Sequence, residues 1–321
     1  MLAVIMAETE EKEGKKDKES KEDKPKRTIR QLYGQLFEKH YKLPLIISFL
    51  LLLFSLVYIA SFYAKTGDIM AKDVTLTGGT VITVFTEEKI SASDVESALA
   101  TKFKDVVVRI LTELRTGKQI AFSVETKANA TELKSELEKY LRYGLTDENS
   151  STEFTGTALS ESFYHELVRA LIIAFVLMAI VVVIQFRKAI PSLAVIQAAL
   201  TDVTFALAVI DLTGIRISTA GIAAFLMLIG YSVDTDILLT TRLLKRREKE
   251  LIERLKDALM TGLTMSLTSI VAVLVAYFIV VSPVLKQVFI IIAVGLFADI
   301  ISTWCGNAAI LKWYCDKKNI T

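Results

Sequence analysis

Long runs of apolar residues dominate the pattern of hydrophobic and polar positions along the chain. The first run, Leu43 to Phe62, contains no charged residue, and at about 1.5 Å per residue it is long enough to cross a ~30 Å hydrocarbon layer. Five more runs follow close together within residues 162–313: Leu167 to Phe186, Ile190 to Asp211, Ile217 to Thr241, Leu259 to Val281 and Val288 to Trp313. The pattern predicts six transmembrane helices.

Residues 63–161, between the first and second runs, have the shorter periods of a soluble domain. Four strands are predicted, over Val74 to Phe85, Val106 to Leu114, Gln119 to Glu125 and Asn149 to Thr155. Two helices separate them, with capping boxes at Ser93 and Glu96 and at Asn129 and Glu132, and Gly144 is expected to stop the second helix. The order β-α-β-β-α-β is that of the ferredoxin-like unit. The predicted fold class is therefore a membrane all-α bundle of six transmembrane helices with one external α+β domain between helices 1 and 2.

Charge sets the expected orientation. Basic residues concentrate in the tail 1–42, in an amphipathic connector at 242–258 and in the tail 314–321, all on one side of the predicted membrane. By the positive-inside rule both termini are cytoplasmic and residues 63–161 are external. With 52% hydrophobic residues, the composition is that of a multi-pass protein of the cell membrane. The basic clusters indicate orientation and contact with membrane lipids, and no nucleic acid is expected as a partner.

Four aspartates lie inside predicted spans: Asp202 in the third, Asp234 and Asp236 in the fourth, and Asp299 in the sixth. A charge inside a spanning helix costs a few kcal/mol, so such residues are usually functional. No lysine or arginine is predicted at comparable depth, and burial without a cation favours the neutral acid. This pattern is typical of a proton relay or a sodium site. Alternatively, each aspartate could hold a neighbouring backbone, cap an interrupted helix or reach the membrane surface.

Their spacing limits how Asp234 and Asp236 can act together. Two positions correspond to about 200° around a helix, so the two side chains cannot face one another as a carboxylate pair. One of them is expected to point into the bundle and the other toward another helix, a cavity or a partner chain.

Other polar residues are weaker candidates. Gly78 and Gly79 indicate a bulge, a close backbone contact or a plain turn. Asp211 and Arg216 flank a short loop and are expected to form a solvated pair. The sequence contains no phosphate-binding glycine loop, no metal-ligand cluster and no Ser/His/Asp arrangement. A soluble type of enzyme is therefore not expected, nor is a cofactor.

The fourth span carries a more specific signal. The stretch Gly230-Tyr-Ser-Val-Asp-Thr-Asp-Ile-Leu-Leu-Thr-Thr-Arg242 resembles the motif of the SecF family of the SecD/SecF protein-export accessory complex, within the resistance-nodulation-division superfamily. Thr77 to Thr80, Gly156 to Arg169 and Thr201 to Val203 are similar to further parts of that family. The resemblance implies a six-span partner, SecD, a SecY-type protein-conducting channel and exported polypeptides. It also implies that proton flow drives motions of the external domains that assist late steps of translocation.

Within the motif, the resemblance marks Gly230, Tyr231, Ser232 and Arg242 as motif or packing positions. Relatives usually carry their functional aspartate where this chain has Thr235, whereas Asp234 stands where SecD has its own aspartate. We therefore assign the main coupling role to Asp234.

Further departures from the family pattern concern charged residues. Thr241 replaces the acidic residue before the motif's arginine, and Thr264 replaces an arginine of the fifth span. The proton mechanism is therefore expected to differ or to depend on the partner chain.

Two other functions remain open at this stage. One is a stand-alone, homo-oligomeric, proton-coupled exporter of small molecules or lipids from the same superfamily. The other is a structural scaffold in which the aspartates hold helices together.

Overall fold

A computed structural model describes residues 33–34, 37–38, 40–113, 116–245 and 249–319. The predicted disordered run in the charged tail, and half of the turn predicted at residues 115–118, lie outside these ranges. Among the described residues, six helical stretches are long and apolar enough to cross a membrane. They are α3 (Lys42–Thr66), α7 (Thr157–Phe186), α8 (Ala189–Leu212), α9 (Thr219–Lys245), α10 (Leu251–Ile279) and the sixth span, Pro283–Lys317. The six predicted spans are confirmed.

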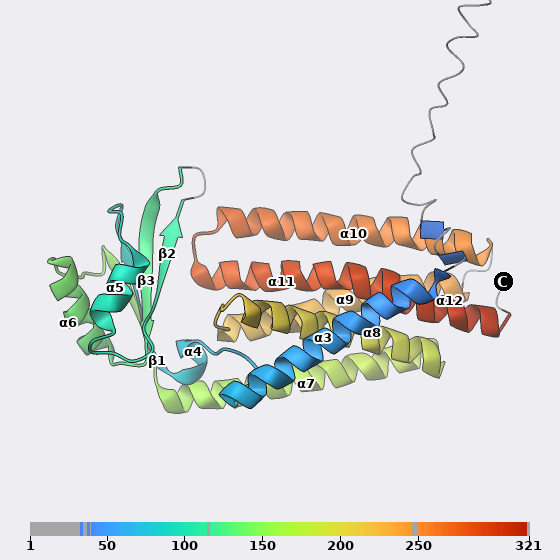
Figure 1. The fold of residues 1–321 in the computed structure, drawn as a ribbon, viewed down its shortest axis with the longest axis horizontal. Coiled ribbons are helices and arrows are strands. Elements are labelled where there is room, and N and C mark those ends of the chain that lie inside the picture. Colours follow the sequence, from blue (N-terminus) through green and yellow to red (C-terminus); the bar gives the residue numbers. More distant parts are fainter. Residues whose placement is uncertain (1–32, 35–36, 39, 114–115, 246–248, 320–321) are drawn as a thin grey trace, which may run out of the picture.

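The spans form one bundle with the α+β domain at one end (Figure 1). About half of the apolar stretch of α8 (50%) and of α9 (56%) is buried by protein, against 6% for α7 and 11% for α10. The inner helices α8 and α9 are thus in contact mainly with other helices, whereas α7 and α10 leave most of their surface for lipid or a partner. The first span begins, and the sixth ends, at the end of the bundle away from the domain.

The sixth span is interrupted by one wide turn. It consists of α11 (Pro283–Ile301), a π-helical segment (Ser302–Asn307) and α12 (Ala308–Lys317). The sequence predicted one regular helix over Val288 to Trp313. A π turn inserts an extra residue and changes which side chains face inward, and such turns are frequent at functional sites.

The α+β domain has the predicted order of elements. Its strands β1 (Gly79–Phe85), β2 (Val107–Thr112), β3 (Gln119–Thr126) and β4 (Ser150–Thr155) form one antiparallel sheet in the order β2-β3-β1-β4. Helices α5 (Ala92–Leu99) and α6 (Ala130–Leu141) cover the sheet through a core that includes Ile82, Phe122 and Leu133. This is the topology of the split βαβ unit, so the fold class is confirmed.

The start of the first predicted strand is wrong. Residues Val74–Thr77 form a short helix, α4. Its N-cap Asp73 accepts a hydrogen bond from the Thr75 amide, which stabilises a first turn, and Gly78 ends it with φ +81°. Strand β1 therefore begins only at Gly79.

One of the two predicted capping boxes is also wrong. Ser91 is the N-cap of α5, and the Glu96 carboxylate accepts a hydrogen bond from the Val108 amide of β2. Asn129 is confirmed as the N-cap of α6, since its side chain accepts from the Thr131 amide. Helix α6 ends at Leu141 with Arg142 in the left-handed region (φ +62°), before the stop predicted at Gly144.

The connector predicted at 242–258 as a surface helix is made of the ends of two spans. Helix α9 continues to Lys245 and α10 begins at Leu251. Leu255 and Leu259 are buried in an apolar cluster that also contains Phe37 and Trp304. Because these leucines lie four residues apart, they continue one face of α10 into the bundle. Phe37, in the predicted charged tail, shows that the tail's last residues also pack on the bundle.

Candidate functional site

Three of the four predicted aspartates meet in the middle of the bundle. Asp202 on α8, Asp236 on α9 and Asp299 on α11 each have no exposed surface. Asp202 accepts hydrogen bonds from the Ser232 hydroxyl of α9 and from the Ser302 hydroxyl of the π segment, both at 2.5 Å. The acid of the third span is therefore held by the fourth and sixth spans.

Asp299 is the most heavily bonded of the three. It accepts hydrogen bonds from Thr235 (3.0 Å to each oxygen), from Ser266 of α10 (3.3 Å) and from Thr303 (2.9 Å). The Thr303 hydroxyl is also 2.9 Å from Asp236 Oδ1. Since a hydroxyl carries one proton, Thr303 can donate to only one of the two carboxylates at a time. Asp299 and Asp236 are thus linked through a single shared hydroxyl.

The cluster has capacity for further hydrogen bonds. Asp236 also accepts from the Asn307 amide at 2.7 Å, while Asp236 Oδ2 and Asn307 Oδ1 are buried and have no partner among the described residues. Within the described ranges, no lysine or arginine forms an ion pair with these three aspartates. We call Asp202, Asp236 and Asp299 the acid cluster. It is held by neutral donors only.

The structure places Asp234 away from the acid cluster. Asp234 is exposed on the opposite face of α9, as the 200° separation from Asp236 requires. It lines a cavity of about 240 Å³ between α9 and α10, together with Tyr231, Thr235 and Ser266. Thr235 and Ser266 also bond Asp299, so these two residues separate Asp234 from the cluster.

The other residues of the motif divide between these two faces. Ser232 is buried on Asp202, whereas Tyr231 is 46% exposed and Gly230 faces open space. Arg242 donates a hydrogen bond to the Asp257 carbonyl at 2.8 Å and so joins α9 to α10.

Sequence reasoning missed four ligands of the acid cluster: Ser266, Ser302, Thr303 and Asn307. Polar residues inside an apolar span were a usable signal for all four. However, the three in the sixth span face inward together only because of the π turn, which the hydrophobic pattern did not indicate.

A second polar site joins the α+β domain to the bundle. The Ile217 amide donates to the Ala71 carbonyl (2.6 Å), and the Asp73 amide donates to the Ile217 carbonyl (3.1 Å). The Thr219 amide donates to the Thr75 hydroxyl at 3.0 Å. The segment before β1 is thereby paired with the loop between α8 and α9, and we call residues 71–75 and 215–219, with Glu125, the joint.

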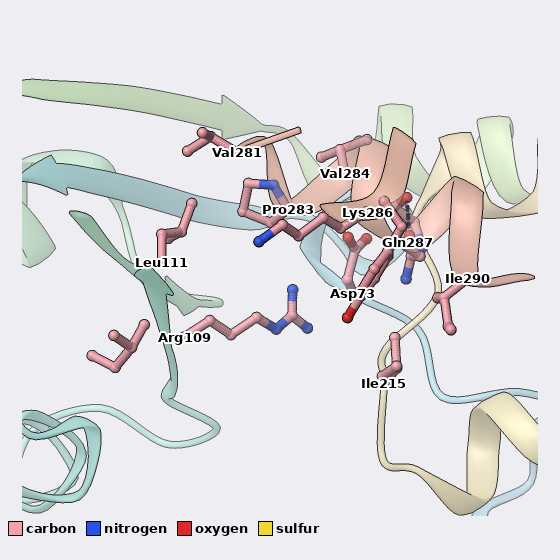
Figure 2. Close-up of a pocket in the computed structure, with 13 residues that line it drawn as sticks. Asp73, Arg109, Leu111, Ile215, Val281, Pro283, Val284, Lys286, Gln287 and Ile290 are labelled. Carbon is pink, nitrogen blue, oxygen red and sulfur yellow. Dashed lines mark hydrogen bonds between the residues drawn. The ribbon is translucent and has the colours of Figure 1, made fainter. Parts of the chain in front are cut away.

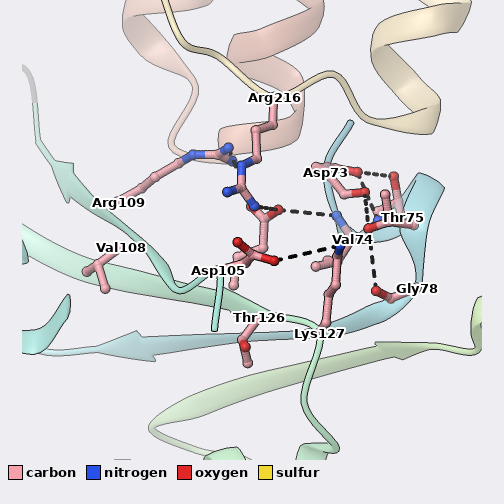
Figure 3. Close-up of polar contacts among 12 residues, drawn as sticks. Asp73, Val74, Thr75, Gly78, Asp105, Val108, Arg109, Thr126, Lys127 and Arg216 are labelled. Carbon is pink, nitrogen blue, oxygen red and sulfur yellow. Dashed lines mark hydrogen bonds and ion pairs between the residues drawn. The ribbon is translucent and has the colours of Figure 1, made fainter. Parts of the chain in front are cut away.

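Glu125 of β3 is the buried acid of the joint (Figure 3). Its carboxylate accepts from the Val74 amide (3.2 Å) and pairs with Arg109 of β2 (3.4 Å) and with Arg216 of the α8–α9 loop (3.5 Å). The predicted solvated pair of Asp211 and Arg216 is therefore wrong. Arg216 pairs with Glu125, and Asp211 is buried and accepts from the Ala71 amide at 3.0 Å.

Asp73 lies beside this ion pair. Burial raises the pKa of the Asp73 carboxyl to about 6, and the neighbouring Glu125 charge adds to the effect, although hydrogen bonds from Thr75 oppose it. The joint thus contains one acid held between two guanidinium groups and one acid that titrates in a mildly acidic range.

Gly78 and Gly79 have the close backbone contacts considered from the sequence. A Cβ on Gly78 would lie 2.5 Å from Thr157 Cα at the start of α7, and one on Gly79 would lie 2.4 Å from the Thr126 carbonyl oxygen. Both residues also have positive φ (+81° and +146°). The first residues of the domain are therefore pressed against the second span.

Comparison with known proteins decides the family. Residues 136–317 match the family described as protein export membrane protein SecD/SecF, C-terminal. The chain is 38% identical over 283 residues to the protein-export membrane protein SecF of Methanocaldococcus jannaschii, covering 86% of this chain and 96% of that protein. The chain belongs to the SecD/SecF family, in its SecF branch. It is also 35% identical over 253 residues to the SecF of Methanothermobacter thermautotrophicus, covering 77% of this chain and 85% of that one.

Solved structures agree on the fold of this SecF-family chain. It aligns with SecDF, a translocon-associated membrane protein from Thermus thermophilus, with a TM-score of 0.68 and 21% identity over 87% of its length. A second SecDF structure, in a super-membrane-facing form, aligns with a TM-score of 0.55 and 23% identity over 85% of the chain. In each case the alignment covers 38% of the longer SecDF chain. The shared fold includes both the bundle and the domain.

Proposed function

We propose that this SecF-family chain is an accessory subunit of the Sec protein-export machinery that couples proton movement to motion of its α+β domain. It would act as a transport subunit and not as an enzyme. The observation that carries the proposal is the acid cluster, in which three fully buried carboxyls are bonded only by hydroxyl and amide donors among the described residues. Buried acids inside a membrane bundle that lack a cationic partner are typical of proton relays.

The shared Thr303 hydroxyl supplies a chemical route for a proton. When Asp236 carries a proton, it can donate to the Thr303 oxygen while the Thr303 hydroxyl donates to Asp299, 2.9 Å away. Reversal of both bonds transfers the proton without any side chain leaving the cluster. The unpartnered Asp236 Oδ2 and Asn307 Oδ1 give the neutral acid a place for its own bond.

Asp234 fits an entry position better than a place within the relay. It faces outward beside Thr268, which is also exposed, on a stretch of α9 and α10 that an isolated chain would present to lipid. An aspartate facing lipid costs roughly 2.5–3.5 kcal/mol on the insertion scale. We therefore place the partner SecD against this face, with Thr235 and Ser266 between Asp234 and Asp299.

The joint would transmit movement of the bundle to the domain. The loop between α8 and α9 connects the helices that carry Asp202 and Asp236, and the same loop holds the domain through Ile217 and Arg216. A change in the packing of α8 on α9 would thus tilt the domain. The basic residues at the opposite end of the bundle place both termini in the cytoplasm and the domain outside, next to a SecY-type channel and the exported polypeptide.

Two measurements test the proposal. Gentle solubilisation of native membranes, capture of this tagged chain and mass spectrometry should recover a second six-span protein together with channel subunits. In vesicles that contain this complex, Asp299→Asn should abolish the part of polypeptide export that depends on an imposed proton gradient. The matched control is Glu153→Gln on the exposed face of β4, which should leave that part intact.

Each result has an opposite that rejects part of the proposal. Recovery of the chain alone as a homo-oligomer would favour the stand-alone exporter. Full gradient-dependent export by Asp299→Asn, with the complex intact, would reject the acid cluster as the proton site. If Asp299→Asn destabilised the complex without changing coupling, the scaffold function would be preferred.

A further inference from the structure

A cavity at the domain end of the bundle takes no part in the proton route. Its volume is about 190 Å³, and it lies between strand β2 and the adjoining ends of α10 and α11 (Figure 2). Its apolar walls include Leu111, Ile215, Tyr277, Val281, Val284 and Ile290. At ~30 Å³ for each molecule of liquid water, it has the volume of about six waters. That is enough for a small polar group but not for a whole lipid.

Two cations reach into this cavity from opposite walls. Figure 2 shows Arg109 extending from β2 and Lys286 extending from α11 toward it. Lys286 is half-buried, and its ammonium group has no hydrogen bond or ion pair within the described part of the chain. Arg109 shares its single carboxylate partner, Glu125, with Arg216. The cations therefore outnumber the acids here, with Arg109, Arg216 and Lys286 against Glu125 and Asp73.

We propose that this cavity is a binding site for an anionic phosphate group, of the kind that a phospholipid headgroup carries. A guanidinium and an ammonium on opposite walls can both donate charge-assisted hydrogen bonds to the phosphate oxygens. Such a group would give Lys286 the partner that it lacks and would balance the excess positive charge.

The surroundings of the cavity favour a lipid as the carrier of the phosphate. Directly beside it, the ends of α10 and α11 expose large apolar side chains: Phe278 (48%), Ile279 (73%) and Leu285 (46%). A phosphate held between Arg109 and Lys286 would place its acyl chains along this surface. The bound headgroup would also bridge β2 of the domain to α11 of the bundle, independently of whether protons cross the acid cluster.

Asp73 lines the same cavity and opposes an anion when it is ionised. It is faced by Glu125, Arg109 and the Thr75 hydroxyl, and Lys286 lies across the cavity. Asparagine at this position would keep the helix cap of α4, because its side-chain oxygen can accept the same Thr75 amide bond. Asp73→Asn should therefore tighten phosphate binding without unfolding the joint.

Native mass spectrometry of the full-length protein in detergent can test the site. The probes are dioctanoyl phosphatidylglycerol, dioctanoyl phosphatidylcholine and inorganic phosphate, each titrated against wild type and variants. We expect one equivalent of phosphatidylglycerol to bind, with a dissociation constant about tenfold higher in Lys286→Gln, as for the loss of one charge-assisted bond. Lys286→Arg should retain binding. The matched control is Lys65→Gln, an exposed lysine in the last turn of α3 at the same end of the bundle.

The three probes distinguish the possible sources of the phosphate. Tight, Lys286-dependent binding of phosphatidylglycerol with weak binding of inorganic phosphate identifies a lipid headgroup site. Equally tight, Lys286-dependent binding of inorganic phosphate identifies a site for the free ion and supports the same chemistry. Equal affinity of wild type and Lys286→Gln for phosphatidylglycerol would overturn the proposal. Because Asp73→Asn predicts a gain in affinity, which misfolding cannot produce, weaker binding by that variant would also count against the site.

Discussion

The acid cluster and the joint each contain a buried carboxylate, but they solve its burial in opposite ways. Glu125 in the joint lies between Arg109 and Arg216 and accepts a backbone hydrogen bond. Asp299 in the cluster has three hydroxyl donors, Thr235, Ser266 and Thr303, and no cation among the described residues. An acid between two arginines is held ionised, whereas an acid held by hydroxyls can gain or lose a proton and leave no unpaired cation behind.

This difference separates structure from chemistry. Removal of the Glu125 charge should cost folding energy, because two guanidinium groups would lose their partner. Removal of the Asp299 charge should cost coupling and little stability, since its donors are neutral and can also accept. The predictions below test that contrast in order of decreasing free energy.

The largest effect is expected for Glu125→Gln. Loss of one partner from a buried ion pair typically costs 3–5 kcal/mol, but Arg109 and Arg216 are partly exposed and lie 3.4–3.5 Å away, so we expect about 2–3 kcal/mol. Chemical unfolding of the purified protein, with hydrogen exchange of the β1 and β3 amides, measures it. Glu153→Gln on β4 is the control and should change the free energy of unfolding by less than about 0.5 kcal/mol. Equal effects of the two substitutions would show that the Glu125 charge is not structural.

A pH-dependent effect of about 2 kcal/mol is expected from Asp73. Its pKa is raised from 3.8 to about 6 in the folded protein, so between these values the folded state binds more protons than the unfolded state. Stability should therefore fall as pH rises through this range, and the penalty of the buried charge is fully present above about pH 6. Comparison of wild type with Asp73→Asn from pH 3.5 to 7 measures it, since the variant lacks this titration. Parallel curves would mean that Asp73 has an ordinary pKa.

Much of the fold follows from the sequence because it depends on local periodicity. Runs of apolar residues located all six spans, and alternation located the four strands. The errors came where tertiary contacts compete with local signals. Glu96 bonds β2 and not its own helix end, and Val74 to Thr77 are β-branched or apolar yet form a helix because Asp73 caps them.

The site was less accessible to prediction, for a geometric reason. The sequence identified Asp202, Asp236 and Asp299, but it could not show that they meet, because contact between spans depends on helix rotation. The π segment at Ser302–Asn307 alters that rotation within the sixth span and brings Thr303 between two aspartates. The family motif favoured Asp234, which instead faces the cavity between α9 and α10.

Thr303→Val tests the link between the two acids. Valine has nearly the same shape as threonine but no hydroxyl, so a proton could no longer pass between Asp236 and Asp299 through this side chain. We expect the gradient-dependent export rate to fall about tenfold, which corresponds to about 1.4 kcal/mol in the barrier. Thr303→Ser retains the hydroxyl and should restore most of the rate. If valine and serine behaved alike, the hydroxyl would not be the link.

The smallest change in stability is expected for Asp299→Asn, although the same substitution should abolish coupling. The asparagine oxygen can still accept from Thr303, and its amide can donate to the oxygens of Thr235 and Ser266, so no buried donor need be left without a partner. We expect the free energy of unfolding to change by less than about 1 kcal/mol. The infrared carbonyl band of protonated carboxyl groups should lose intensity at the same time. A loss of stability as large as that of Glu125→Gln would show that the negative charge of Asp299 supports the bundle, and the distinction between the cluster and the joint would then be wrong.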